Sequence, residues 1–187
     1  MSILGWRHWA VDTDGLLRPA WTPWSPYPDD LLLWRPDGLT RARCLRTSEE
    51  RTAETLFGFV PAAHSPAVGA DGQDGRSGRD GYPDADGYGG RHGHARIPDP
   101  SCVCGLYAWR DAATLAAARV PRWTRRPIVV GVARLGGRVI VAEHGYRAER
   151  GYPVAVFDPE GVVSPRYPVA RYRSWPALTA EWRPAEP

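Results

Sequence analysis

Residues 128–157, IVVGVARLGGRVIVAEHGYRAERGYPVAVF, decide what kind of fold this chain can form. Apolar and β-branched residues dominate 128–135 and recur in 138–143 and 152–157, as is typical of strands bounded by glycine and polar residues. Gly136 and Gly137 have the form of a two-residue hairpin turn between the first two runs. We therefore predict a three-strand β-meander in the C-terminal half of the chain.

The remainder of the chain predicts further short strands and a few helices. Along Gly5–Val11, Trp6, His8 and Ala10 alternate with Arg7, Trp9 and Val11, which indicates a strand. Further short strands are expected at 31–34 and 39–45, and short helices at 47–57, at 112–119 and after Ser174. The expected fold is α+β and β-dominated, a small mixed sheet or partly open barrel with two or three short helices.

Length and composition favour one domain over residues 1–187. Residues 67–98 are rich in Gly, Asp and Arg and almost without aliphatic side chains, so they predict a disordered insertion. All 24 basic residues are arginine, as GC-rich coding would produce. No apolar run reaches membrane-spanning length and no signal pattern opens the chain, so we expect a cytoplasmic protein without membrane contact.

Residues 101–108, SCVCGLYA, supply the main chemical signal. Cys102 and Cys104 can bind one metal ion from a single turn, and Gly105 permits the tight backbone that this requires. Cys44 and His64 would complete a tetrahedral set that suits zinc. The spacing matches no short zinc-finger pattern, so buried thiols without metal, or a reactive Cys102 or Cys104, stay open as alternatives.

A four-ligand zinc site of this type is normally structural, because a catalytic zinc keeps one position open. Here the metal would join Cys44 and His64 in the N-terminal half to the cysteine pair of the C-terminal half. Its binding would contribute on the order of 10 kcal/mol to the stability of the fold. We therefore expect a zinc-stabilised protein that acts by binding rather than catalysis.

An enzyme is the alternative class, and its candidate residues are His8, Glu143, His144, Arg147 and Glu149. Such a pocket, with or without zinc, would activate water or position an anionic substrate. The competing interpretation is that Arg147 and Glu149 form a partly buried pair that orders the loop after the hairpin.

The expected partner is another protein, bound by exposed Trp/Pro segments such as Trp21–Pro28, where rigid aromatic side chains lose little entropy on binding. A nucleic-acid-binding module that uses arginine and tryptophan is a further alternative. The net charge of +3 is too small to imply nucleic-acid binding by itself, because the basic residues are spread among many acidic ones.

The motif series resembles that of an actinobacterial protein family. Its likeness covers 41–44 (RARC), 64–66 (HSP), 102–108 (CVCGLYA), 131–139 (GVARLGGRV), 143–149 (EHGYRAE) and Tyr152-Pro153. The family pattern has Ile where this chain has Leu106 and Trp where it has Gly136, and it lacks the long insertion. The resemblance implies that the four ligands occur together and implies no activity.

Overall fold

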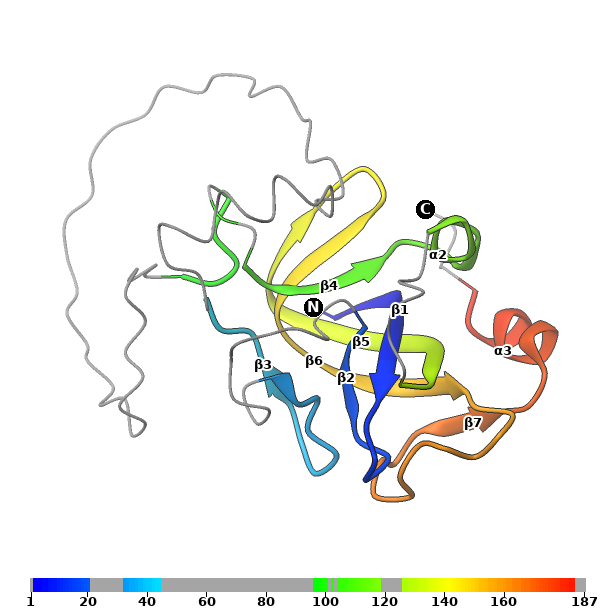
Figure 1. Cartoon of the computed structure of the whole chain (residues 1–187). Helices are drawn as coiled ribbons and strands as arrows, with labels where there is room; N and C mark the ends of the chain where they lie inside the picture. The colour runs from blue at the N-terminus through cyan, green and yellow to red at the C-terminus, as the bar shows by residue number, and fades with distance from the viewer. Residues whose placement is uncertain are drawn as a thin grey trace, which may run out of the picture.

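Two long antiparallel strands, β5 (Ile128–Val141) and β6 (Gly145–Phe157), form the frame of the molecule. The computed structural model describes residues 2–20, 32–44, 96–100, 102, 104–118 and 126–183. The other described elements are β1 (Ile3–Val11), β2 (Leu17–Pro19), β3 (Thr40–Arg41), β4 (Leu106–Trp109), β7 (Ala170–Tyr172), α2 (Ala112–Ala117) and α3 (Trp175–Glu181). Figure 1 shows α2 and α3 at the side of the sheet away from β3.

The strand pairings nearly close the sheet on itself. β1 pairs with β5, β5 with β6, β6 with β4, and β4 returns to β1 through one residue pair, Trp6 opposite Trp109. Since a single pair closes this ring, the sheet is not a regular barrel. β7 runs parallel to β6 while every other pairing is antiparallel, so the sheet is mixed. The predicted β-dominated α+β fold with a small mixed sheet is confirmed.

The predicted hairpin turn at Gly136 and Gly137 is wrong, and the predicted three-strand meander is a two-strand hairpin, because β5 and β6 are each continuous. β5 continues through both glycines to Val141, and the pairing with β6 shifts register between Gly136 and Val139. Gly137 has a φ of +71°, and the N–H of Arg138 donates to the Glu149 carboxylate at 3.0 Å. A β-bulge, like a tight turn, uses glycine because glycine readily adopts a positive φ. This explains why the sequence predicted a turn where the structure has a bulge. The chain reverses between β5 and β6, where the Ala142 N–H donates to the Gly145 carbonyl at 2.8 Å.

The predicted strands at 31–34 and 39–45 are wrong in extent. Residues 32–34 lie outside any strand, and β3 covers only Thr40–Arg41. Both residues of β3 pair with β6, at Gly151 and Arg150. The short strand therefore serves to carry the chain along the edge of β6 toward Cys44.

The sheet separates two apolar cores. Alternation along β1 sends Trp9 into one core, where its ring packs edge-on against Trp34 at 5.3 Å between centroids, and Trp6 into the other. The second core lies beneath the helices and contains Leu115 of α2 and Leu178 of α3. Trp9 and Trp34 are thus the largest fully buried side chains, and they pack among Val, Leu and Ala residues.

The two described helices begin where the sequence predicts. Asp111 accepts a hydrogen bond from the Thr114 N–H at 2.7 Å and caps α2, and Ser174 accepts one from the Ala177 N–H at 3.4 Å and caps α3. The predicted helix at 47–57, the Trp21–Pro28 segment, His64 and residues 67–95 of the predicted insertion lie outside the described residues. No helix in the described part of the chain is both long and apolar enough to cross a membrane.

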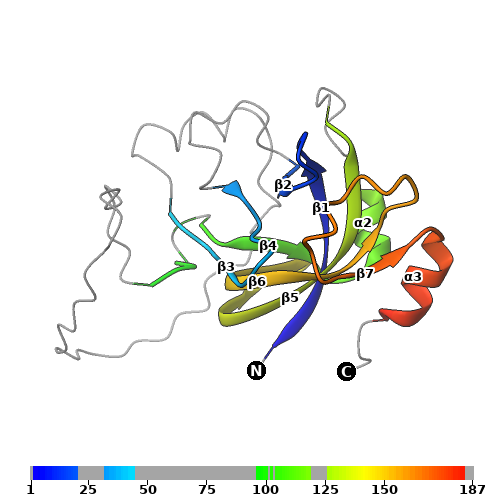
Figure 2. The same ribbon diagram turned by 90° about the horizontal axis from the view of Figure 1, so that it is seen from below.

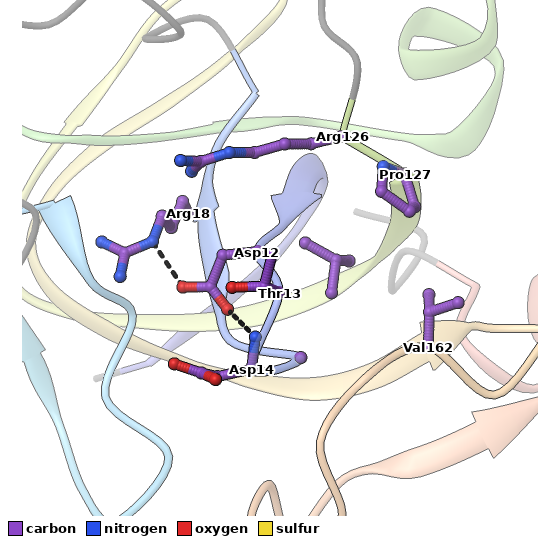
Figure 3. Close-up of a pocket in the computed structure, with 9 residues that line it drawn as sticks. Asp12, Thr13, Asp14, Arg18, Arg126, Pro127 and Val162 are labelled. Carbon is purple, nitrogen blue, oxygen red and sulfur yellow. Dashed lines mark hydrogen bonds and ion pairs between the residues drawn. The ribbon is translucent and has the colours of Figure 1, made fainter.

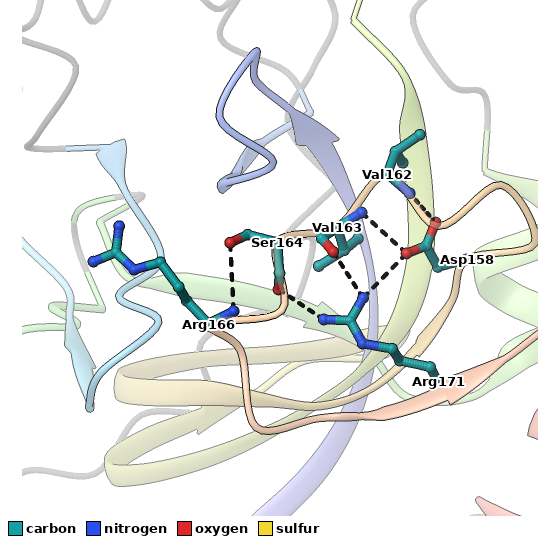
Figure 4. A network of polar contacts seen from close by, with 6 residues as sticks. All are labelled: Asp158, Val162, Val163, Ser164, Arg166 and Arg171. Carbon is teal, nitrogen blue, oxygen red and sulfur yellow. Dashed lines mark hydrogen bonds and ion pairs between the residues drawn. The ribbon is translucent and has the colours of Figure 1, made fainter.

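The connection from β6 to β7 is fixed by a buried carboxylate (Figure 4). Asp158, whose side chain is 1% exposed, accepts hydrogen bonds from the N–H groups of Val162 at 2.8 Å and Val163 at 3.0 Å. Arg171 donates to Asp158 at 3.3 Å and to the carbonyls of Val163 and Ser164 at 2.8 and 2.7 Å. This connection places Tyr167 in the first core, where its hydroxyl accepts from the Leu17 N–H and donates to the Trp34 carbonyl.

Candidate metal centre

The chain approaches the candidate metal centre from two segments that are far apart in the sequence. The first segment leaves β3, where the Ala42 N–H donates to the Glu149 carbonyl at 2.7 Å, and reaches Cys44 two residues later. The second segment, called here the cysteine turn, comprises the described residues 99, 100, 102, 104 and 105, leads into β4 and carries Cys102 and Cys104. Figure 2 shows β3 and β4 on the same part of the β5–β6 hairpin. Pairing with β6 therefore brings both cysteine segments to one place.

Backbone hydrogen bonds and one glycine set the shape of the cysteine turn. The Cys102 N–H donates to the Asp99 carbonyl at 3.2 Å, and the Asp99 N–H donates to Cys104 Sγ at 3.4 Å. Gly105 has a φ of +133°, a conformation that side chains other than glycine rarely adopt. A Cβ at this position would also lie 3.2 Å from the Cβ atoms of Pro98 and Arg147. The Cys-x-Cys-Gly pattern thus has a direct structural reason.

The three sulfur atoms have the spacing of metal ligands. All three lie within 4.8 Å of one another, and Cys44 Sγ is 3.7 Å from Cys102 Sγ. Zinc–sulfur bonds of about 2.3 Å in a tetrahedral site place two sulfurs about 3.8 Å apart. No disulfide joins these cysteines, which are the only three in the chain. Cys102 and Cys104 are buried and Cys44 is half-buried, so a metal here would be shielded from water on most sides.

Burial makes a bare thiolate unfavourable at this site. It raises the pKa of Cys104 to about 11, although the hydrogen bond from the Asp99 N–H acts in the opposite direction. A bound divalent cation would reverse this balance, because a coordinating thiol is deprotonated by the metal. The site therefore suits either three packed neutral thiols or three thiolates around a cation. The described residues fit a metal ion of the zinc type.

Arg147 of β6 holds the cysteine turn in place. Its guanidinium donates to the Asp99 carbonyl at 3.3 Å and to the Cys102 carbonyl, so one side chain joins two positions of the turn. Among the described residues no ion pair links Arg147 to Glu149, whose carboxylate instead accepts the Arg138 N–H at the bulge. Arg147 and Glu149 are each partly buried, but Arg147 orders the cysteine turn and Glu149 orders the bulge in β5. Nothing in the sequence indicates that Arg147 reaches the cysteine turn, although both belong to the same motif series.

The remaining candidate residues lie apart from this centre. Glu143 and His144 are exposed on the β5–β6 turn, with His144 Nε2 3.7 Å from Glu143 Oε1. His8 is buried in β1, where desolvation first and the charge of Arg7 second lower its pKa to about 4. Within the described structure no hydrogen bond or ion pair connects His8 to the other candidates, and Nδ1 of His8 has no partner. These residues are not assembled into an acid–base pocket by polar contacts.

A separate depression of about 490 Å³ lies beside the turn after β1 (Figure 3). Its wall includes Asp12, Asp14, Arg18 and Arg126. The Asp12 carboxylate accepts from Arg18 Nε at 2.7 Å and from the N–H groups of Asp14 and Leu16 at 3.0 and 2.8 Å. Burial alone would raise the pKa of Asp12, but these donors hold it below its usual value. Asp12 thus stabilises the turn after β1, and the cysteine cluster remains the better candidate for a functional site.

Comparison of the chain with protein-family models, with curated proteins and with solved structures finds no match. The predicted fourth ligand, His64, lies outside the described residues. The candidate centre consequently rests on Cys44, Cys102 and Cys104 and on the contacts that position them.

Proposed function

We propose that this chain binds one zinc ion through Cys44, Cys102, Cys104 and His64, and that the metal stabilises the fold for a binding role. The observation that supports this most strongly is the convergence of three sulfur atoms from two distant segments. Three cysteines packed only as small apolar residues have no need to place their sulfurs at ligand spacing. The choice of zinc rests on the match of thiolate and imidazole to its preferences.

A zinc ion at this position would join the segment after β3 to the turn before β4. Both strands are short, since β3 has two residues and β4 has four, and each pairs with β6. The metal would add a cross-link where hydrogen bonding alone is sparse. Thiolate ligands need reducing conditions, and this supports a place in the cytoplasm. The proposal of a protein partner for the Trp21–Pro28 segment rests on the sequence alone.

Elemental analysis of the purified protein tests the metal assignment. We expect about one zinc per chain in the wild type and a loss of zinc together with a fall in Tm in Cys44→Ser and Cys104→Ser. Ala20→Ser places a hydroxyl at another buried position and serves as the matched control: its Tm falls while its zinc content stays. Preparations without zinc in the absence of chelator would refute the proposal.

The enzyme alternative draws on the half-buried Cys44 and on the fact that all three described ligand candidates are thiols. If His64 does not bind the metal, three thiolates and a water molecule would make an open site. His64→Ala discriminates between the two. A closed structural site predicts lower zinc affinity and lower Tm in this variant, whereas unchanged zinc content and Tm would favour the open site and a search for hydrolase substrates.

A further inference from the structure

One face of the β3–β6–β5 part of the sheet carries two adjacent rows of basic and aromatic residues. In the first row Arg41 lies opposite Arg150, and Arg150 lies opposite Gly136. In the second row Tyr152 lies opposite Arg134. Residues opposite one another, and residues two apart on one strand, share a face of the sheet. The Arg41, Arg150, Arg134 and Tyr152 side chains therefore make one surface, called here the arginine face.

The side chain of Arg150 extends across this surface toward β5. Its Nε lies 3.9 Å from the position that a Cβ on Gly136 would occupy. The Arg150 side chain therefore lies beside Gly136 of β5. Arg41 and Tyr152 are exposed, and Arg134 and Arg150 are half-buried with their stems on the sheet.

The charges on the arginine face are not balanced within the described part of the chain. There, Arg41 and Arg150 form no hydrogen bond or ion pair, and Arg134 donates only to Ser2 Oγ, at 3.4 Å, while its Nε is buried without a partner. The Glu149 carboxylate accepts the neutral Arg138 N–H and forms no ion pair with these arginines in the described structure. Like charges directly opposite on paired strands are destabilising. The stem of Arg150 packs on the sheet, but the guanidinium groups of Arg41 and Arg150 have no polar role within the described part of the fold.

An extended anion would satisfy this arrangement better than a small one. Strands lie about 4.8 Å apart, so the first row, from β3 to β5, spans about 10 Å of the described sheet. Guanidinium groups bind phosphate oxygens with matching geometry, and an exposed tyrosine offers a surface for base stacking. We propose that the arginine face binds single-stranded nucleic acid, with phosphates on Arg41, Arg150 and Arg134 and a base on Tyr152. This proposal goes beyond the metal centre and does not depend on which metal it holds.

The net charge of +3 does not oppose this proposal, because the local arrangement determines the field that a ligand meets. Binding is tested with zinc-replete full-length protein and a fluorescein-labelled oligo(dT) of about 15 nucleotides, followed by fluorescence anisotropy. We expect binding at about 50 mM salt that weakens steeply toward about 200 mM. The double variant Arg41→Gln/Arg150→Gln is expected to lower affinity at least about tenfold. It should also reduce the log–log salt slope by about 1.4, because each phosphate that an arginine neutralises adds about 0.7 to the slope.

Tyr152→Leu is expected to weaken binding about tenfold with an unchanged salt slope, because stacking carries no charge. The control is Arg173→Gln/Arg183→Gln, which removes the same charge from exposed positions beside α3. It should bind nearly as well as the wild type. No binding at about 50 mM salt, or equal losses of affinity in the two double variants, would overturn the proposal. Equal affinity for duplex DNA and heparin, with no effect of Tyr152→Leu, would also overturn it and indicate an unspecific basic surface.

Discussion

At the scale of single residues, the metal centre depends on groups that do not touch the metal. Arg147 joins the Asp99 and Cys102 carbonyls, the Asp99 N–H meets Cys104 Sγ, and Gly105 permits the backbone path between the cysteines and β4. Supporting groups of this kind fix ligand orientation and tune metal affinity. Their replacement should weaken zinc binding while all cysteines remain in place.

Arg147→Lys tests this support. Lysine keeps the charge, but a single ammonium lacks the forked geometry that reaches both carbonyls. We expect zinc affinity to fall about 10- to 100-fold, measured by competition with a chromophoric chelator. Arg138→Lys is the control, because in the described structure the Arg138 guanidinium makes no hydrogen bond. An unchanged affinity in Arg147→Lys would show that the turn holds its shape without this residue.

Gly105→Ala is expected to destabilise the protein by about 1–3 kcal/mol, through an unfavourable φ and close contacts with Pro98 and Arg147. Gly38→Ala is the comparison, since a Cβ there meets nothing within 4 Å. Its effect should stay within about 0.5 kcal/mol. Urea denaturation of the two variants measures the difference, and equal values would contradict the strained geometry assigned to Gly105.

At the scale of elements, the long β5–β6 hairpin organises the molecule, because β1, β3, β4 and β7 all pair with it. Hydrophobic runs and caps in the sequence were enough to predict β1, the strand character of 128–141, α2 and α3. The bulge at Gly136–Val139 was not predictable, since glycine serves turns and bulges alike and the deciding contact comes from Glu149 on another strand.

Two glycines in β5 differ in how closely atoms of β6 approach them. A Cβ on Gly131 would lie 2.0 Å from the Ala155 carbonyl oxygen, whereas the nearest atom to one on Gly136 is Arg150 Nε at 3.9 Å. We expect Gly131→Ala to cost about 3 kcal/mol or more and Gly136→Ala less than about 1 kcal/mol. Denaturant unfolding measures both. A mild effect at Gly131 would mean that β5 and β6 can separate locally without loss of the sheet.

At the scale of the whole molecule, the ring of strands divides the apolar residues between two cores and brings distant cysteines together. The convergence of Cys44 with Cys102 and Cys104 was predictable from the sequence, because the chain has only three cysteines. The arginine face was not, since register between β3, β6 and β5 cannot be read from one strand at a time. His8 and Glu143 were grouped as candidates, yet the fold buries one and exposes the other.

Acid should destabilise the fold partly through His8. The pKa of His8 is about 4 in the folded protein, below the ordinary value of about 6.5, so the unfolded chain binds the proton first. The stability that depends on neutral His8 is therefore fully present above pH about 6.5 and is lost as pH falls toward about 4, a loss on the order of 3 kcal/mol. Denaturation of the wild type and His8→Gln across this pH range isolates the effect of His8, because acid-driven metal loss affects both proteins. Parallel pH profiles would contradict the assignment.

X-ray absorption at the zinc edge of the purified protein would decide whether the three cysteines bind the metal. We predict three sulfur neighbours at about 2.3 Å and one nitrogen neighbour at about 2.0 Å. Loss of one sulfur in Cys44→Ser would connect that shell to the segment after β3. A shell of nitrogen and oxygen without sulfur, or a protein that takes up no zinc, would contradict the proposed metal centre and leave Cys44, Cys102 and Cys104 as packed thiols.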